Sequence, residues 1–168
     1  MNSMKEIRIE KLTINIGAGK DQAKLEKGIK LIKNITGLDP VKTVSKKRIP
    51  EWGIRPGLPI GCKITLRNKK AAELLGVMLK AKDNKLNRSC FGDGTVSFGI
   101  HEYIDVPGVK YDPEIGVMGF QVCITLERPG FRIKRRCVRK RVVSSGHMIK
   151  SEDSIDFMKK KFSVEVEE

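Results

Sequence analysis

Residues 41–70 read VKTVSKKRIPEWGIRPGLPIGCKITLRNKK, and the rest of the chain is organised around this stretch. Its three prolines and three glycines interrupt both helix and strand, so the first two thirds are predicted to form a long loop. Residues 60–68 are predicted to form a strand in which Lys63, Thr65 and Arg67 share one face. A positive loop that leads into a positive strand face is typical of a phosphate-binding surface.

The predicted loop has a basic rim and one aromatic side chain near its tip. Glu51 is the only acid in the whole stretch. A single tryptophan is most often a core anchor, but glycines and prolines flank Trp52 on both sides, so a buried and an exposed position both stay open. The basic residues of the rim are Lys46, Lys47, Arg48 and Arg55.

Upstream of the stretch, the pattern predicts a strand over residues 5–16 and a helix over residues 21–35. The apolar residues of the strand change parity at Glu10 and Lys11, which indicates a β-bulge. The helix ends at Thr36-Gly37, a common stop signal.

Downstream, hydrophobic periodicity and turn signals predict the remaining elements. They are a helix over 69–82, a loop over 83–88, strands over 95–100 and 117–126, a short helix within 131–141, a helix over 151–161 and an edge strand within 162–168.

The order of these elements favours an α+β fold. Strands and helices do not alternate regularly, so we expect an open antiparallel or mixed sheet with helices packed on one face. The 168 residues suit one domain that spans residues 1–168, and 39% apolar residues suffice for a core.

The composition points to a polyanionic partner. Thirty-four Lys and Arg against twenty Asp and Glu give a net charge of +14. The sequence contains no long apolar run and no apolar signal core, so we expect a cytoplasmic protein without a membrane partner. Four cysteines and two histidines show no metal-ligand spacing, so no metal site is expected.

The outward residues of the predicted strands are hydrogen-bonding or positive, and none is a stacking aromatic. Such a face suits contacts with RNA phosphates and 2′-hydroxyls, and an ordinary solvated face is the alternative. RNA contact is favoured because the adjoining loops share the charge. The residues of this face are Thr13, Asn15, Lys63, Thr65, Arg67, Gln121 and Thr125.

A second basic region follows residue 127. Residues 128–141 contain eight basic residues and no acid, and beyond Arg128 these residues are predicted to contact RNA outside the sheet face. They are Arg132, Lys134, Arg135, Arg136, Arg139, Lys140 and Arg141.

Catalytic chemistry has little support in the sequence. His101 and Glu102 share one loop with Asp105, but no nucleophile, base and orienting group can be assembled by motif spacing. The GAGK turn at residues 17–20 lacks the glycine spacing of a nucleotide-binding loop, so no cofactor and no small-molecule substrate is expected. An RNA-processing or RNA-modifying enzyme remains the alternative function.

Several segments resemble the universal large-subunit ribosomal protein five (L-five) family, and the basic residues at 128–141 resemble its archaeal and eukaryotic branch. The segments are LTINIGAGK, ITGLDPVKTVSKK, GIRPGLPIGCKITLR and FGDGTVSFGIHEY. The resemblance implies an α+β fold and a structural protein that binds 5S ribosomal RNA in the central protuberance, beside large-subunit ribosomal RNA and other large-subunit proteins.

The resemblance also implies roles for single residues. In the family the sheet face and adjoining turns hold 5S ribosomal RNA, which by motif match implies Asn15, Thr65, Arg67 and Asp93. The loop before the IGCKITLR strand reaches toward transfer RNA in the peptidyl site. By position, this implies contacts from Lys46, Lys47, Arg48, Trp52 and Arg55. The basic residues beyond Arg128 are then expected to contact other ribosomal RNA.

Overall fold

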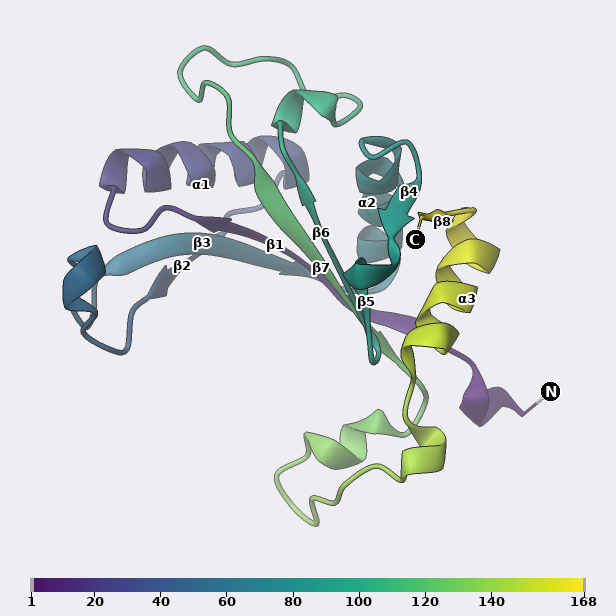
Figure 1. Cartoon of the computed structure of the whole chain (residues 1–168). Coiled ribbons are helices and arrows are strands. Elements are labelled where there is room, and N and C mark those ends of the chain that lie inside the picture. The colour runs from purple at the N-terminus through teal and green to yellow at the C-terminus, as the bar shows by residue number, and fades with distance from the viewer. Residues whose placement is uncertain (1, 168) are drawn as a thin grey trace.

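The computed structural model describes residues 2–167 and is built on a six-stranded sheet (Figure 1). The strand order is β2-β3-β1-β7-β6-β5, and every pairing is antiparallel. The strands are β1 (Arg8–Gly17), β2 (Val41–Val44), β3 (Pro59–Leu66), β5 (Phe91–Gly92), β6 (Thr95–Ile100) and β7 (Phe120–Glu127). The predicted α+β class with an open antiparallel sheet is confirmed.

Three α-helices accompany the sheet: α1 (Gln22–Thr36), α2 (Asn68–Lys80) and α3 (Ser151–Phe162). Helices α1 and α2 cover one face of the sheet, and α3 packs beside β5 and β6 (Figure 1). The Asp21 carboxylate caps α1 by accepting hydrogen bonds from the backbone N–H groups of Ala23 and Lys24. Gly37 ends the helix in the left-handed conformation, at φ 68°.

The helix-covered face of the sheet is apolar because alternate strand residues point to it. Leu12 of β1, Ile64 of β3 and Ile124 of β7 are buried there with the inner faces of α1 and α2. Two glycines permit this close packing. A Cβ on Gly61 would lie 2.5 Å from the carbonyl oxygen of Ile16, and a Cβ on Gly28 would lie 3.2 Å from a side-chain atom of the sheet.

The bulge predicted at Glu10 and Lys11 is confirmed. The β1–β7 register shifts between Ile9 and Lys11, so Glu10 is the extra residue of β1. Beyond the bulge, Lys11 lies opposite Thr125, on the face of the sheet that α1 and α2 leave open. Because of the bulge, Ile9 and Leu12 point to the same core although one is odd-numbered and the other even-numbered.

Other predicted boundaries were wrong. Residues 41–44 form the edge strand β2 within the predicted loop, and the predicted loop at 83–88 contains β4 (Lys85–Asn87). The C-terminal strand β8 (Glu165–Glu167) pairs in parallel with β4 in a separate two-stranded sheet, so it does not extend the main sheet. The helix predicted within 131–141 is a single 3₁₀ turn over Phe131–Lys134, and β7 begins at Phe120 rather than at residue 117.

The cysteines occur as free thiols rather than in disulfides or a metal site. Cys62 is fully buried in β3, and this burial raises the pKa of its thiol to about 11, whereas Cys137 is exposed. Among residues 2–167, no group of three potential metal-ligating side chains comes together. None of the helices in this part of the chain has the length and apolar character required to span a bilayer.

Candidate nucleic-acid interface

The face of the main sheet opposite α1 and α2, called the open face below, carries polar and basic side chains. Its polar residues come from β1, β3, β6 and β7, none of its residues is aromatic, and β2 adds the exposed Val41 opposite Lys63. The polar residues are Lys11, Thr13, Asn15, Lys63, Thr65, Thr95, Ser97, Gln121, Cys123 and Thr125.

The strand register brings five predicted interface residues into one contiguous group. Thr13 lies opposite Thr65 on β3, and Asn15 lies between Lys63 on one side and Gln121 on the other. The Asn15 side-chain amide donates a hydrogen bond of 3.2 Å to the Gln121 side-chain oxygen. These neighbours therefore present a row of donors and acceptors across three strands.

Two predicted residues lie at one end of this face rather than on it. Arg67 follows β3 and precedes α2, and Asp93 occupies the exposed turn between β5 and β6. The backbone N–H of Leu126 donates to the carbonyl oxygen of Gly94, so the turn adjoins the C-terminal end of β7. This is also the end at which residues 128–141, the basic segment, leave the sheet.

Residues 45–58, called the tip loop, project from the opposite end of the sheet (Figure 1). Ile49 and Ile54 exchange two backbone hydrogen bonds of 2.9 and 3.0 Å, and Pro50–Trp52 form a 3₁₀ turn between them. Trp52 is 65% exposed, which decides between the two positions that the sequence left open. The four predicted cations of the rim are exposed as well.

The basic segment is exposed along most of its length, including all seven residues predicted to contact ribosomal RNA. Arg128 differs, because its side chain is only 11% exposed. Its guanidinium donates to the carbonyl oxygens of His147 and Met148 and pairs with Asp153 at 3.1 Å. Arg128 therefore attaches the chain before α3 to the end of β7 and is not part of the exposed charge of the basic segment.

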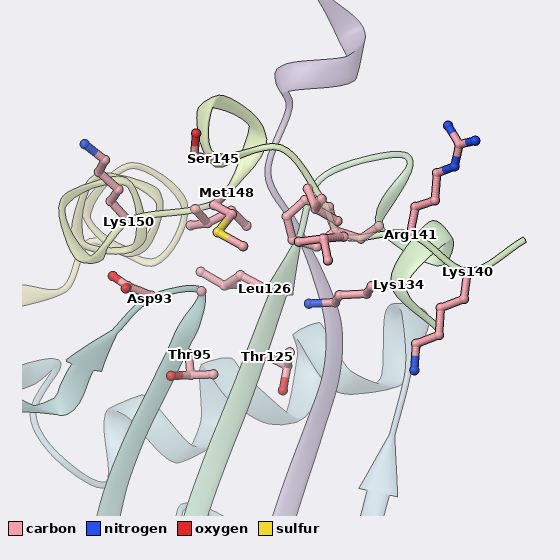
Figure 2. A pocket seen from close by; sticks show the side chains of 15 residues that line it. Asp93, Thr95, Thr125, Leu126, Lys134, Lys140, Arg141, Ser145, Met148 and Lys150 are labelled. Atoms are coloured by element: carbon pink, nitrogen blue, oxygen red, sulfur yellow. The ribbon is translucent and has the colours of Figure 1, made fainter. Parts of the chain in front are cut away.

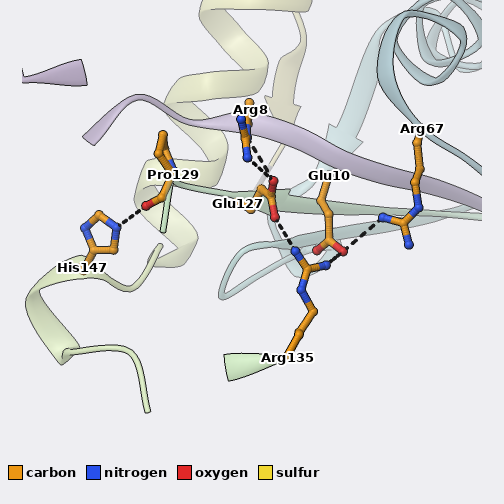
Figure 3. A network of polar contacts seen from close by, with 7 residues as sticks. All are labelled: Arg8, Glu10, Arg67, Glu127, Pro129, Arg135 and His147. Atoms are coloured by element: carbon orange, nitrogen blue, oxygen red, sulfur yellow. Dashed lines mark hydrogen bonds and ion pairs between the residues drawn. The ribbon is translucent and has the colours of Figure 1, made fainter. Parts of the chain in front are cut away.

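Two glutamates organise the end of the open face (Figure 3). Glu127 of β7 pairs with Arg8 at 2.7 Å and with Arg135 at 2.8 Å. Glu10, at the bulge, pairs with Arg67 at 3.4 Å and also with Arg135. The two carboxylates are only 8% and 10% exposed, so they fix three guanidinium groups at the edge of the interface.

Arg135 thus connects the basic segment to two strands at once. Arg67 and Arg135, both predicted to contact RNA, are already engaged in ion pairs within the protein, although each remains about half exposed. Neither glutamate was predicted from the sequence. The parity change at Glu10 was the one sequence signal for its position. A residue in a β-bulge does not follow the regular alternation, so its side chain can lie on the face that alternation would assign to its neighbours.

Replacing Glu10 or Glu127 with Gln should reduce the free energy of unfolding by about 1–2 kcal/mol, since each change leaves buried polar groups beside two arginines while solvent screens the exposed partners. Urea denaturation measures this loss. We also expect trypsin to cleave the variants faster within residues 132–141, because Arg135 loses an anchor.

Glu114→Gln provides the matched control. Glu114 pairs with Lys30, but its side chain is 79% exposed, so its removal should change neither stability nor cleavage appreciably. Equal behaviour of all three variants would contradict the anchoring role of Glu10 and Glu127.

Comparison with known proteins gives consistent matches over the whole chain. Residues 2–55 match the family model described as ribosomal protein L5, and residues 59–157 match the model of the C-terminus of the same ribosomal family. The large ribosomal subunit protein uL5 of Nanoarchaeum equitans is 47% identical over 164 residues, which cover 97% of each chain. The proteins of the same name from Sulfurisphaera tokodaii and Methanosphaera stadtmanae are each 44% identical and cover 100% and 99% of this chain, and 96% and 100% of their own.

Proposed function

Because the chain belongs to the ribosomal protein L5 family, we propose that it is a structural, non-catalytic constituent of the large ribosomal subunit that binds 5S ribosomal RNA. It then acts on cytoplasmic ribosomes beside large-subunit ribosomal RNA and other large-subunit proteins. The open face holds the 5S RNA, the tip loop contacts transfer RNA in the peptidyl site, and the basic segment contacts large-subunit RNA.

The observation that carries the 5S assignment is the chemistry of the open face. Lys63 supplies a cation for phosphate, and Thr65, Asn15 and Gln121 supply hydrogen-bonding groups beside it. Without aromatic side chains, this face cannot stack splayed bases over its length. It suits a folded RNA that the protein recognises by its shape, through contacts with the phosphates and the 2′-hydroxyl groups.

The opposed positions of the tip loop and the basic segment support separate roles for them. Asn15 and Gln121 adjoin the end that carries the tip loop, whereas Glu127 precedes the basic segment at the other end. A single RNA on the open face therefore leaves the exposed Trp52 and its neighbouring cations available for a second RNA.

Lys63→Gln and Thr65→Val should each weaken 5S RNA binding by about threefold to tenfold, because each removes one contact with the RNA backbone. Within residues 2–167 neither side chain hydrogen-bonds or pairs with another residue, so the fold should be unaffected. Filter binding with purified 5S RNA measures the change. Arg67 is a less clear test of RNA contact, since its removal also leaves Glu10 with one partner fewer.

Lys27→Gln on α1 is the matched control, because it removes the same charge from an exposed site on the helix side of the sheet. If Lys27→Gln weakens binding as much as Lys63→Gln does, only the total charge matters and the open face is not the binding surface.

A further inference from the structure

A cavity of about 760 Å³ opens where the basic segment folds beside the ends of β6 and β7 (Figure 2). Ligand sites in proteins commonly have this size. Its apolar lining comes from the end of β7, from the 3₁₀ turn that follows it and from the chain that leads to α3. The apolar residues are Leu126, Phe131, Val142, Val143, Met148 and Ile149.

The polar groups of the cavity are arranged around this lining. Lys134 points across the cavity toward Leu126, and Thr95 and Thr125 present hydroxyl groups below it (Figure 2). The Lys134 ammonium also lies 4.8 Å from the centre of the Phe131 ring, so a positive charge adjoins the apolar centre. Lys140, Arg141 and Lys150 also line the cavity, but their charged ends point away from its centre and form an outer rim, and Asp93 is the one acid of the lining (Figure 2).

This combination restricts the chemistry of an occupant. Val142 is 86% exposed and Met148 is about half exposed, so apolar surface faces solvent inside a basic rim. An occupant must therefore bring a flat or bulky apolar group and negative charge attached to it. An unpaired nucleotide has both features, because every base has an apolar π-face and carries a phosphate on each side of its sugar.

The cavity is also continuous with the open face. Thr95 and Thr125 belong to both, so an RNA on the open face reaches the cavity without a gap.

We propose that this cavity binds one unpaired nucleotide of 5S ribosomal RNA, with the base against Val142 and Met148, the two exposed apolar residues of its lining, and a phosphate on Lys134. The assignment rests on the proposed function and adds to it a site where the protein recognises a base. The rest of the open face contacts only backbone and groove.

The test fills the cavity and measures 5S RNA binding. Met148→Trp and Ser145→Phe each place a large side chain in the lining from a partly or fully exposed position, so neither disturbs the core. Each should weaken filter binding of 5S RNA by about tenfold, because the new side chain fills the space of one base and its apolar contact is lost. Val117→Trp, at an exposed valine in the loop between β6 and β7, is the control and should bind as the original chain does. Circular dichroism confirms that all three are folded.

Short-wave ultraviolet crosslinking of the complex provides the second measurement. We expect RNA attached to the peptide that contains Val142 or Met148, and no such adduct in the filled variants. If the original chain binds 5S RNA and both filled variants bind it equally well, the cavity assignment is overturned while the proposed function stands. The cavity assignment is also overturned if the filled variants bind 5S RNA normally but fail to assemble into large subunits. That result would mean that a side chain of another protein occupies the cavity. If the original chain does not bind 5S RNA at all, the proposed function itself fails.

Discussion

Raising the salt concentration from about 50 to about 200 mM should weaken 5S RNA binding by about 10³-fold, if six phosphates are neutralised. Each Lys or Arg that meets a phosphate releases a condensed counterion from the RNA, and this release loses its entropic advantage as the bulk salt rises. Six such contacts are available on the open face and at its end. They are Lys11, Lys63 and Arg67, together with the three cations of the basic segment that line the cavity, Lys134, Lys140 and Arg141; the other cations of that segment remain for large-subunit RNA.

The slope of log affinity against log salt measures the number of these contacts directly. Lys63→Gln should lower the slope by about one contact, whereas Lys27→Gln on α1 should leave it unchanged. A flat salt response would contradict an interface built on cations. An equal loss of slope in both variants would mean that the charges act from the whole surface and not from the open face.

Excision of the tip loop should abolish contact with transfer RNA and spare 5S RNA binding. The loop is closed by two backbone hydrogen bonds of 2.9 Å, in which Ser45 donates to Leu58 and Gly57 donates to Ser45. Replacing residues 46–56 with Asn-Gly, a pair that favours tight hairpin turns, should therefore preserve the β2–β3 pairing. The excision removes all five side chains assigned to transfer RNA in one step.

Fluorescence gives a first measurement, because Trp52 is the only tryptophan and is exposed. Transfer RNA should quench the Trp52 emission of the original chain, whereas 5S RNA should not. Crosslinking of peptidyl-site transfer RNA to reconstituted large subunits then tests the excised variant, which should give no adduct. Loss of 5S RNA binding in a folded excision variant would overturn the separation of the two roles.

Hydrophobic periodicity was sufficient to predict the long helices and central strands. Leu12, Ile14 and Ile16 occupy alternate positions of β1 because one face of the strand is buried. This pattern does not depend on which elements cover that face, so it can be recognised from the sequence alone. The bulge was predictable for the same reason, since a strand that keeps one face buried can change parity only by inserting an extra residue.

The short strands were not predictable because tertiary pairing creates them. β2 has exposed valines at both ends, and β4 gains its pairing from β8, whose residues lie about 80 positions later in the chain. The local sequence does not indicate a strand partner so far away in the chain, so its pattern predicts a polar loop at Lys85–Asn87.

The sequence predicted which β3 side chains lie on the open face but not the ion pairs at the end of that face. The alternation that exposes Lys63 and Thr65 is a local property of β3, and it placed them correctly on the open face. By contrast, the pairing of Arg135 with Glu10 joins residues 125 positions apart, and nothing in either local sequence indicates it. The sequence of the basic segment therefore gave no sign that Arg135 anchors the segment or that the Arg128 side chain is largely covered.

The most direct measurement is filter binding of the purified chain to 5S ribosomal RNA at low ionic strength, with transfer RNA as the matched polyanion. We expect saturable binding of 5S RNA that an equal concentration of transfer RNA displaces poorly, because the proposed function assigns transfer RNA to the tip loop alone. Failure to bind 5S RNA, or equal binding of both RNAs, would contradict the claim that the open face recognises 5S ribosomal RNA.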